Sequence, residues 1–332
     1  MSNKRIFYAC QSLAIYKSDM TNPIEVHGLQ SVGITTTFNL EQVFEIGQLA
    51  IYENIETVPD IEVTTEKVLD GYPPIFLLAT KEGAGPTLIQ RSKAKCSAML
   101  SIYKDTSEQA SGVGQHQVLL SGLFPTSVGY TMPAEGNATE SVTLAGYHKF
   151  WGGEALSVSN FGTDAPKTGV QRREDFLMAT SLLPTEIRGI NAQGGNITAE
   201  EGGGFKAKIT NINVNCDLGR EQLFELGKRT PYHRYVSFPV EVTAEFTTIG
   251  LSGDLVDADG DSTSNISNQT IDLKMADGLR LNLGDKNKLQ SVGYSGGDAG
   301  GDNVEITYNY QTFNDFTVTH PHPDVHASGM PH

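Results

Sequence analysis

The sequence predicts a mainly β protein, built as two similar β-sandwich or barrel domains that each carry a short flanking helix. Blocks of residues return in the same order in the two halves of the chain, as expected of a duplicated unit. Several segments alternate apolar and polar residues, which is typical of strands with one buried face. The 35 glycines suit turns between short strands, and 332 residues suit two domains of about 150 residues each.

The repeat is clearest in "EQVFEIG" at residues 41–47, which returns as "EQLFELG" at residues 221–227. One match of this length is expected on the order of once by chance in such a chain, so the order of further matches decides the question. Three more pairs keep the order: "LQSVGI" (29–34) with "ITNINV" (209–214), "PDIEVTTE" (59–66) with "PVEVTAE" (239–245), and "SVGY" (127–130) with "SVGY" (291–294). We therefore interpret the chain as a tandem duplication.

Strands are predicted at corresponding places in both copies. In "PVEVTAEFTTI", apolar residues alternate with Glu and Thr over residues 240–247, and "DIEVTTE" at residues 60–66 alternates in the same way. After each "SVGY" block, a turn rich in Gly and Asn leads into another β-rich run, at residues 140–147 or 303–310. Each copy is therefore expected to contain a hairpin there.

The blocks at residues 41–47 and 221–227 are predicted to form one short helix per copy. Their apolar residues fit one side of a helix, and Gly47 or Gly227 would end it in left-handed geometry. Such a helix would cover one face or end of the sandwich, whose apolar side needs a cover.

The boundary between the copies is predicted near residue 170. The segment "SVSNFGTDAPKTGVQ" at residues 157–171 is rich in Gly, Ser, Thr and Pro, as linkers are. The predicted parts are a first domain (1–170), a second domain (171–319) and a flexible His-rich tail (320–332).

Composition argues against several classes of protein. A net charge of −15 opposes general affinity for nucleic acid, because phosphate binding uses clustered Lys and Arg. Cys10, Cys96 and Cys216 show neither a disulfide framework nor a zinc spacing, so we expect packed, reduced thiols. No apolar run approaches the length of about 18 residues that spans a bilayer. No export signal is evident, so the chain is expected in the cytoplasm when it is made.

Two loop motifs suggest ligand sites but lack required residues. "DADGDSTSN" begins at Asp257, yet the glycine and glutamate positions of an EF-hand hold Ser262 and Asn268, so a surface loop is favoured over a calcium site. "YSGGDAGGDN" at residues 294–303 has no lysine of a phosphate-binding loop, so a hairpin loop is favoured there.

Catalytic chemistry is not expected. The C-terminal histidines are His320, His322, His326 and His332. A flexible tail with weak metal affinity is favoured over a built metal site, because the neighbouring prolines oppose a fixed element. The sequence shows no nucleophile elbow, metalloprotease helix or Cys/His pair. We therefore expect no enzyme activity, no cofactor and no resident metal.

The matched blocks resemble tail tube proteins of long-tailed bacteriophages. The resemblance is carried by "FEIGQLAIYENIETVPDIEVTTEKVLDG" and "LLSGLFPTSVGYTMPAEGNATESVTLAGYHKFW" in the first half, and by "LFELGKRTPYHRYVSFPVEVTAEF" and "LGDKNKLQSVGYSGGDAGGDNVEITYNY" in the second. It covers most of residues 27–151 and 205–318. It implies a β-sandwich with a flanking helix, and subunits that join into rings, which stack into a hollow tube through which DNA leaves the capsid.

The resemblance also implies partners and a location. Rings in that family are commonly six-fold, so three chains with two domains each would supply six domains. Two stacked layers made by six chains are the alternative. The implied partners are further copies of this chain, other tail proteins and viral DNA that passes without specific binding, with no membrane. The implied location is the tail of a virion assembled in the host cytoplasm.

The candidate site residues follow from the tube hypothesis. Acidic side chains on a strand face would repel phosphate and let DNA slide, so the candidate lumen residues are Glu62, Glu66, Glu241 and Glu245. An outer, solvated face is the alternative for these residues. Two long loops, 100–117 and 189–204, are expected to order on contact with a neighbouring ring, and the candidate inter-ring residues are Lys104, Asp105, Gly194, Gly195 and Glu201.

Two other functions remain open at this point. A capsid-decorating or tail-adaptor protein would share the acidic, β-rich composition. A ligand-binding β-sandwich is the next alternative, although Trp151 is the only tryptophan available for an aromatic binding face.

Overall fold

The structure is a computed structural model that describes residues 3–21, 23–106, 110, 112–152, 157–158, 168–178, 180–188, 207–250, 253–254, 256–258, 266–297 and 303–322. Most of its elements are strands, so the predicted mainly β class is confirmed. The helices of the described residues are short: α1 (Ile75–Ala79), α2 (Leu88–Arg91), α3 (Thr185–Arg188) and the 3-10 turns η1 (Tyr8–Cys10) and η2 (Arg173–Asp175).

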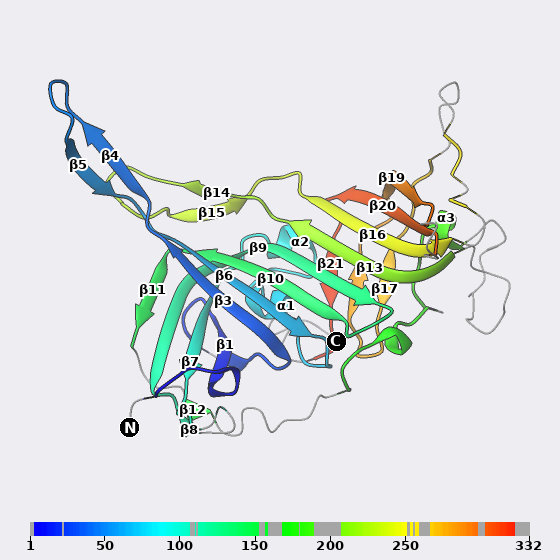
Figure 1. The fold of residues 1–332 in the computed structure, drawn as a ribbon, viewed down its shortest axis with the longest axis horizontal. Helices are drawn as coiled ribbons and strands as arrows, with labels where there is room; N and C mark the ends of the chain where they lie inside the picture. The colour runs from blue at the N-terminus through cyan, green and yellow to red at the C-terminus, as the bar shows by residue number, and fades with distance from the viewer. Residues whose placement is uncertain are drawn as a thin grey trace.

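One antiparallel sheet runs through the molecule (Figure 1). In spatial order, its main path is β19 (Lys288–Ser295), β20 (Glu305–Phe313), β16 (Glu241–Gly250), β13 (Ala207–Asp217), β9 (His116–Pro133), β10 (Thr139–Gly146), β6 (Asp60–Val68) and β3 (Leu29–Thr37). Each half of the chain contributes four of these strands. The order β3-β6-β10-β9 in the first half corresponds to β13-β16-β20-β19 in the second, and the halves meet where β9 pairs with β13.

The repeat is also visible in the irregularities of the ladders. A β-bulge leaves out Gln30 where β3 pairs with β6, and another leaves out Thr210 where β13 pairs with β16. A second pair of bulges leaves out Thr126 between β9 and β10 and Gln290 between β19 and β20. Bulges interrupt a ladder at defined positions. Their recurrence, at the offsets of the "LQSVGI" and "SVGY" blocks, supports the duplication.

The pairing also corrects part of the sequence alignment. Ile34 of β3 lies opposite Val63, and Val214, its equivalent 180 residues later, lies opposite Ala244. Val63 and Ala244 are therefore equivalent, so β6 and β16 are related by an offset of 181 residues.

The predicted match of Glu62 with Glu241 was consequently wrong by two residues. The equivalent of Glu241 is Asp60, and the equivalent of Glu62 is Thr243. A shift by two leaves every side chain on its own face of the sheet, because successive side chains of a strand alternate. The alternating pattern therefore could not reveal the error.

The predicted helices at residues 41–47 and 221–227 were wrong. Both segments belong to hairpins that project from the sheet: the first arm is β4 (Leu40–Phe44) with β5 (Ile51–Glu56), and the second arm is β14 (Arg220–Leu223) with β15 (His233–Val236). Gly47 and Gly227 do adopt positive φ angles, of 106° and 87°, but in the turns of these arms. A glycine at positive φ serves a hairpin turn as well as a helix end, so this signal does not separate the two.

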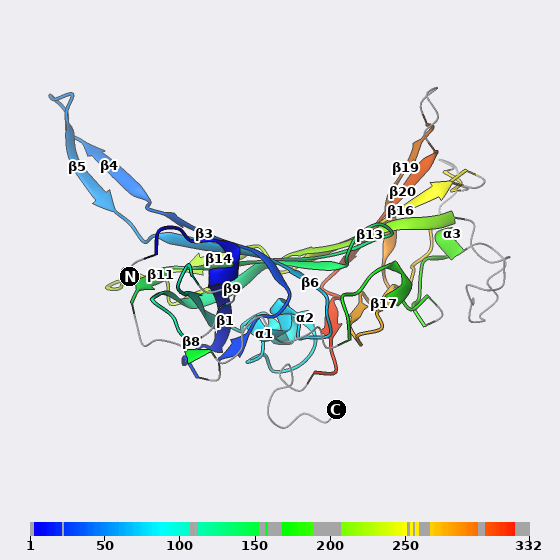
Figure 2. The same cartoon turned by 60° about the horizontal axis from the view of Figure 1, so that its bottom comes forward.

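One face of the sheet is covered and the other is bare. Figure 2 shows α1, α2, β1 and β17 on one side, and the first arm rising away on the other. The strands outside the main path and the two arms are β1 (Gln11–Lys17), β2 (Ile24–Glu25), β7 (Cys96–Ile102), β8 (Gly112–Val113), β11 (His148–Trp151), β12 (Ser157–Val158), β17 (Asp272–Lys274), β18 (Arg280–Asn282) and β21 (Thr317–Thr319). Of these, β1, β2, β7 and β11 branch from β9 within the same large sheet. The buried apolar residues beneath the sheet form one cluster that runs through both halves. The halves therefore share a core as well as a sheet.

Three segment predictions need adjustment. The predicted loop 100–117 is shorter, because β7 continues to Ile102 and β9 already begins at His116. The end of the predicted linker is packed, since buried Gln171 accepts a hydrogen bond from the Asp277 backbone. His320 is only 3% exposed, so the packed chain continues past the predicted start of the tail. Residues 189–204 and His326 and His332 lie outside the described residues.

Candidate assembly surface

The large sheet ends in two open edges. Among the described strands, β3 pairs only with β6, and β19 pairs only with β20. Each edge therefore presents a row of backbone N–H and C=O groups to its surroundings, which is a template for pairing with another strand. Both edges belong to long strands, of nine residues in β3 and eight in β19.

The contact of β9 with β13, which we call the joint, shows how two copies of the repeat fit together. Val214 lies opposite Tyr130, and Ile212 opposite Met132, with these side chains buried on the covered face. The Tyr130 hydroxyl donates a hydrogen bond to Oε1 of Glu140 at 2.8 Å. The strand at one edge of the first half (β9) thus fits the strand at one edge of the second half (β13).

A buried carboxylate anchors the joint to helix α1. Glu140 also accepts hydrogen bonds from the backbone N–H groups of Ile75 and Phe76, where α1 begins. Burial raises the pKa of Glu140, against the opposing effect of these hydrogen bonds and of the one from Tyr130. The nearby Lys67 and Asp70 form a buried ion pair of 2.8 Å. This network supports the packing beneath the joint.

The equivalents of the joint residues lie at the open edges. Tyr294 of β19 corresponds to Tyr130, yet Tyr294 is 56% exposed and Tyr130 is 1% exposed. Ile34 of β3 corresponds to Val214 and is only partly buried. The side chains at the open edges are therefore more exposed than the equivalent side chains in the joint.

The bare face of the sheet is polar and is crossed by regular rows of short side chains. One row runs over all eight strands through directly opposed residues: Ser31, Glu66, Ser141, Gly129, Asn215, Thr243, Gln311 and Lys288. A neighbouring row includes Asn213, whose amide donates a hydrogen bond of 3.1 Å to Glu245. In these rows the charges are carboxylates, except for Lys288 at the β19 edge.

The predicted acidic residues lie on this bare face. Glu62, Glu66 and Glu241 are exposed, and Glu245 is half-buried beside Asn213. All four therefore share one polar surface of the sheet, and their place in a lumen stays a prediction.

The predicted inter-ring residues are divided. Lys104 is exposed, whereas Asp105 is held against the N-terminal segment, since its carboxylate accepts a 2.8 Å hydrogen bond from the Lys4 backbone. Gly194, Gly195 and Glu201 lie outside the described residues.

The second arm is bound to the first half of its own chain. Arg229 donates hydrogen bonds to the backbone oxygens of Glu56 and Thr57, at 2.7 and 3.0 Å. Gln222 and Arg234 both donate to Oδ1 of Asp60, at 3.2 and 2.9 Å.

The Asp60 carboxylate is adapted to these donors. Burial raises its pKa, but hydrogen bonds from Asn39 and Arg234 outweigh that effect and leave the pKa below its ordinary value. Asp60 is therefore charged when the second arm is in place.

The first arm carries a set of exposed apolar side chains. They are Leu40, Phe44, Ile46, Leu49, Ile51, Tyr52 and Ile55. Its four charged residues are all acidic: Glu41, Glu45, Glu53 and Glu56. An isolated two-stranded hairpin is marginal in water, and exposed apolar patches mark interaction sites. The sequence analysis missed both arms because it assigned their apolar residues to a helix.

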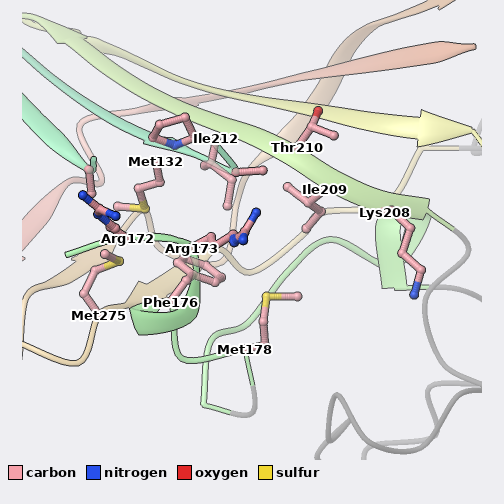
Figure 3. Close-up of a pocket in the computed structure, with 13 residues that line it drawn as sticks. Met132, Arg172, Arg173, Phe176, Met178, Lys208, Ile209, Thr210, Ile212 and Met275 are labelled. Carbon is pink, nitrogen blue, oxygen red and sulfur yellow. The ribbon is translucent and has the colours of Figure 1, made fainter. Parts of the chain in front are cut away.

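A cavity of about 270 Å³ lies beside the joint, where Met132 of β9 and Ile212 of β13 line it (Figure 3). Its apolar lining includes Met132, Phe176 and Met275, and Arg172 and Lys208 share it. The Arg172 side chain donates a hydrogen bond to Asn137. Among the described residues, no His, Cys or carboxylate lines the cavity.

Cys10, Cys96 and Cys216 are buried free thiols, as predicted. Within the described ranges, no group of three or more His, Cys, Asp or Glu side chains is placed to hold a metal ion. The helices of the described chain are all too short or too polar to cross a membrane.

Comparisons with known proteins give little additional information. No family model matches the chain, and no curated protein matches it. One similar solved structure is the cryo-EM structure of the anti-feeding prophage baseplate, 6-fold symmetrised. Its chain is 14% identical, with a TM-score of 0.34, and the match covers 46% of this chain and 98% of that one. At that score the likeness supports no statement about function.

Proposed function

We propose that this protein is the main structural subunit of a phage tail tube, in which chains join edge to edge into rings and rings stack into a conduit for DNA. The observation that carries the proposal is the joint. It is an interface between two copies of the repeat, and the open edges β19 and β3 are its unpaired equivalents.

The joint provides the geometry for the contact between chains. In the joint, the edge strand β9 of the first repeat pairs with the edge strand β13 of the second. The other edge strands of the two repeats, β3 and β19, form the two ends of the main sheet. A second chain can therefore add its β3 to β19 in the same antiparallel manner. Such head-to-tail contacts form a ring when the rotations between successive copies add up to a full turn.

The register between chains follows from the equivalences. In the joint, Val214 lies opposite Tyr130 and Cys216 opposite Val128. The corresponding pairs between chains are Ile34 with Tyr294 and Thr36 with Val292. The side chains of these pairs would be buried on the covered face.

In the proposed ring, the polar face of the sheet faces the lumen. The covering layer, with α1, α2, β1 and β17, occupies one face, so the polar face is left to line the inside (Figure 2). Carboxylates on that wall repel phosphate and keep DNA from adhering. We prefer three chains per ring, which supply six repeats, over six chains.

Cysteine cross-linking tests the register. In the variant with Thr36→Cys and Val292→Cys, oxidation is expected to join chains into covalent oligomers that end at one ring size. Each single variant provides the control. A chain that stays monomeric at assembly concentration, with no cross-link, refutes the proposal.

Negative-stain imaging of the purified protein separates the remaining alternatives. A tube subunit is expected to form stacked rings or hollow rods, and rotational averaging distinguishes three chains from six. Single rings that never stack would favour the tail-adaptor alternative instead.

A further inference from the structure

We propose that the first arm of one chain lies across the second half of the neighbouring chain, in the manner in which the second arm lies across the first half of its own chain. This inference rests on the proposed ring, because it needs a neighbour whose second half adjoins β3. It assigns a partner to the exposed apolar side chains of the first arm, namely a second copy of this chain.

The two arms are the same element in the two repeats. Gln42 lies opposite Asn54 in the first arm, and Gln222 lies opposite Arg234 in the second, 180 residues later in both strands. The turns also match, since Gln48 and Lys228 each donate a backbone hydrogen bond of 3.4 Å to the residue three positions earlier. What one arm contacts is therefore a guide to what the other contacts.

The surface that receives the second arm has an equivalent in the second half. The second arm crosses to the root of the first arm (Figure 1), where it meets Asp60 and the backbone of residues 56–57. Their equivalents are Glu241 and residues 236–237. We call Glu241 with residues 236–238 the receiving surface. Glu241 and Phe238 are exposed in the single chain, so this surface is open to a partner.

Polar chemistry is retained at the proposed contact. In the chain itself, the amide of Gln222 donates to the carboxylate of Asp60. Between chains, the amide of Gln42 would donate to the carboxylate of Glu241. Asn54 occupies the position of Arg234 and would supply the second donor, as Arg234 does for Asp60.

At the position of Arg229, the first arm has an apolar side chain in place of the hydrogen-bond donor. Leu49 occupies the position of Arg229, which in the second arm reaches the backbone of Glu56 and Thr57. Leu49 is fully exposed in the single chain, and Phe238 on the receiving surface is 44% exposed. Contact between these two side chains removes apolar area from water on both partners.

The receiving surface has a further exposed aromatic residue close to it. Phe313 lies directly opposite Glu241 across the ladder and is half exposed. The proposed contact thus keeps its carboxylate, with Glu241 in the place of Asp60. It replaces the contact of Arg229 with the backbone by a contact of Leu49 with exposed aromatic side chains.

The test uses the full chain with paired cysteines and a short bis-maleimide. The variant with Gln42→Cys and Glu241→Cys is expected to give covalent oligomers under assembly conditions. The variant with Gln222→Cys and Asp60→Cys, which brings together two residues in contact in the single chain, is the matched control. It is expected to give an internal link that changes gel mobility without joining chains.

The result is compared with that of the edge variant, Thr36→Cys with Val292→Cys. Oligomers from both the arm pair and the edge pair confirm the inference. Oligomers from the edge pair alone overturn it and leave the proposed ring intact. An arm pair that links chains while the edge pair does not overturns the proposed register, and absence of both overturns ring and arm contact together.

Discussion

Replacing Tyr294 with alanine is expected to weaken ring assembly while leaving the single chain folded. Tyr294 lies on the open edge of β19, where its side chain is 56% exposed and supports little of the core. Its equivalent in the joint, Tyr130, is 1% exposed. Pairing with β3 of another chain should therefore bury Tyr294 to the same degree.

The magnitude follows from the area that the contact buries. A buried tyrosine covers about 150–250 Å², so the change in exposure corresponds to roughly 100 Å². At about 25 cal/mol per Å², the side chain contributes about 2.5 kcal/mol to each interface between chains. Because 1.4 kcal/mol corresponds to a tenfold change in affinity, the Tyr294→Ala interface should be roughly 60-fold weaker.

Sedimentation of a concentration series measures this effect as a shift of the midpoint between single chains and rings. Ile89→Ala is the control, because Ile89 is 59% exposed and belongs to α2, which lies beneath the middle of the sheet and not at an edge (Figure 2). The thermal midpoint of the single chain should be unchanged in both variants. If Tyr294→Ala assembles at the wild-type concentration, the correspondence between the edge and the joint is wrong.

Three further predictions concern the buried carboxylate, the polar face and the thiols. Burial raises the pKa of Glu140 in the folded chain, so the native state holds this proton to higher pH than the unfolded state does, and the stability it contributes is lost as pH rises from about 4.3. Glu140→Gln should lack that loss, and urea unfolding at a series of pH values measures it as the change of the unfolding free energy with pH. The same pH dependence of that free energy in both proteins would contradict the prediction. Glu66→Lys combined with Glu245→Lys should leave rings assembled but make them retain DNA in low salt, as measured by a gel-shift assay; equal mobility of DNA with variant and wild type would remove these residues from the lumen. Burial raises the pKa of Cys96 and of Cys216 to about 12, so a thiol-reactive dye should label neither until urea unfolds the chain, and labelling of the native protein would show that these thiols are accessible.

The alternation of apolar and polar residues in the sequence was sufficient to predict strands and their buried faces. The alternation at residues 60–66 and 240–247 indicated strands with one buried face, and burial in β6 and β16 follows it. The order of the repeated blocks likewise indicated two copies before any pairing was known. These signals are readable because the period of a strand is a property of consecutive residues.

The arms show where local patterns are insufficient. Residues 41–47 carry an apolar cluster followed by Gly47, a pattern that suits both a helix with its end and a hairpin with its turn. The tertiary structure decided between them, because Gln42 and Asn54 pair across the arm while the apolar side chains remain outside the core.

The joining of the halves was likewise a tertiary outcome. The sequence indicated two similar domains, and only the structure showed that β9 pairs with β13 so that both halves share one sheet and one core. Strand pairing over some 80 residues depends on which edges meet in space, which no pattern within one strand encodes. The sequence by itself therefore determined the repeated unit and the faces of its strands, whereas the tertiary structure decided how the units join and which edges remain open, because backbone pairing is non-local.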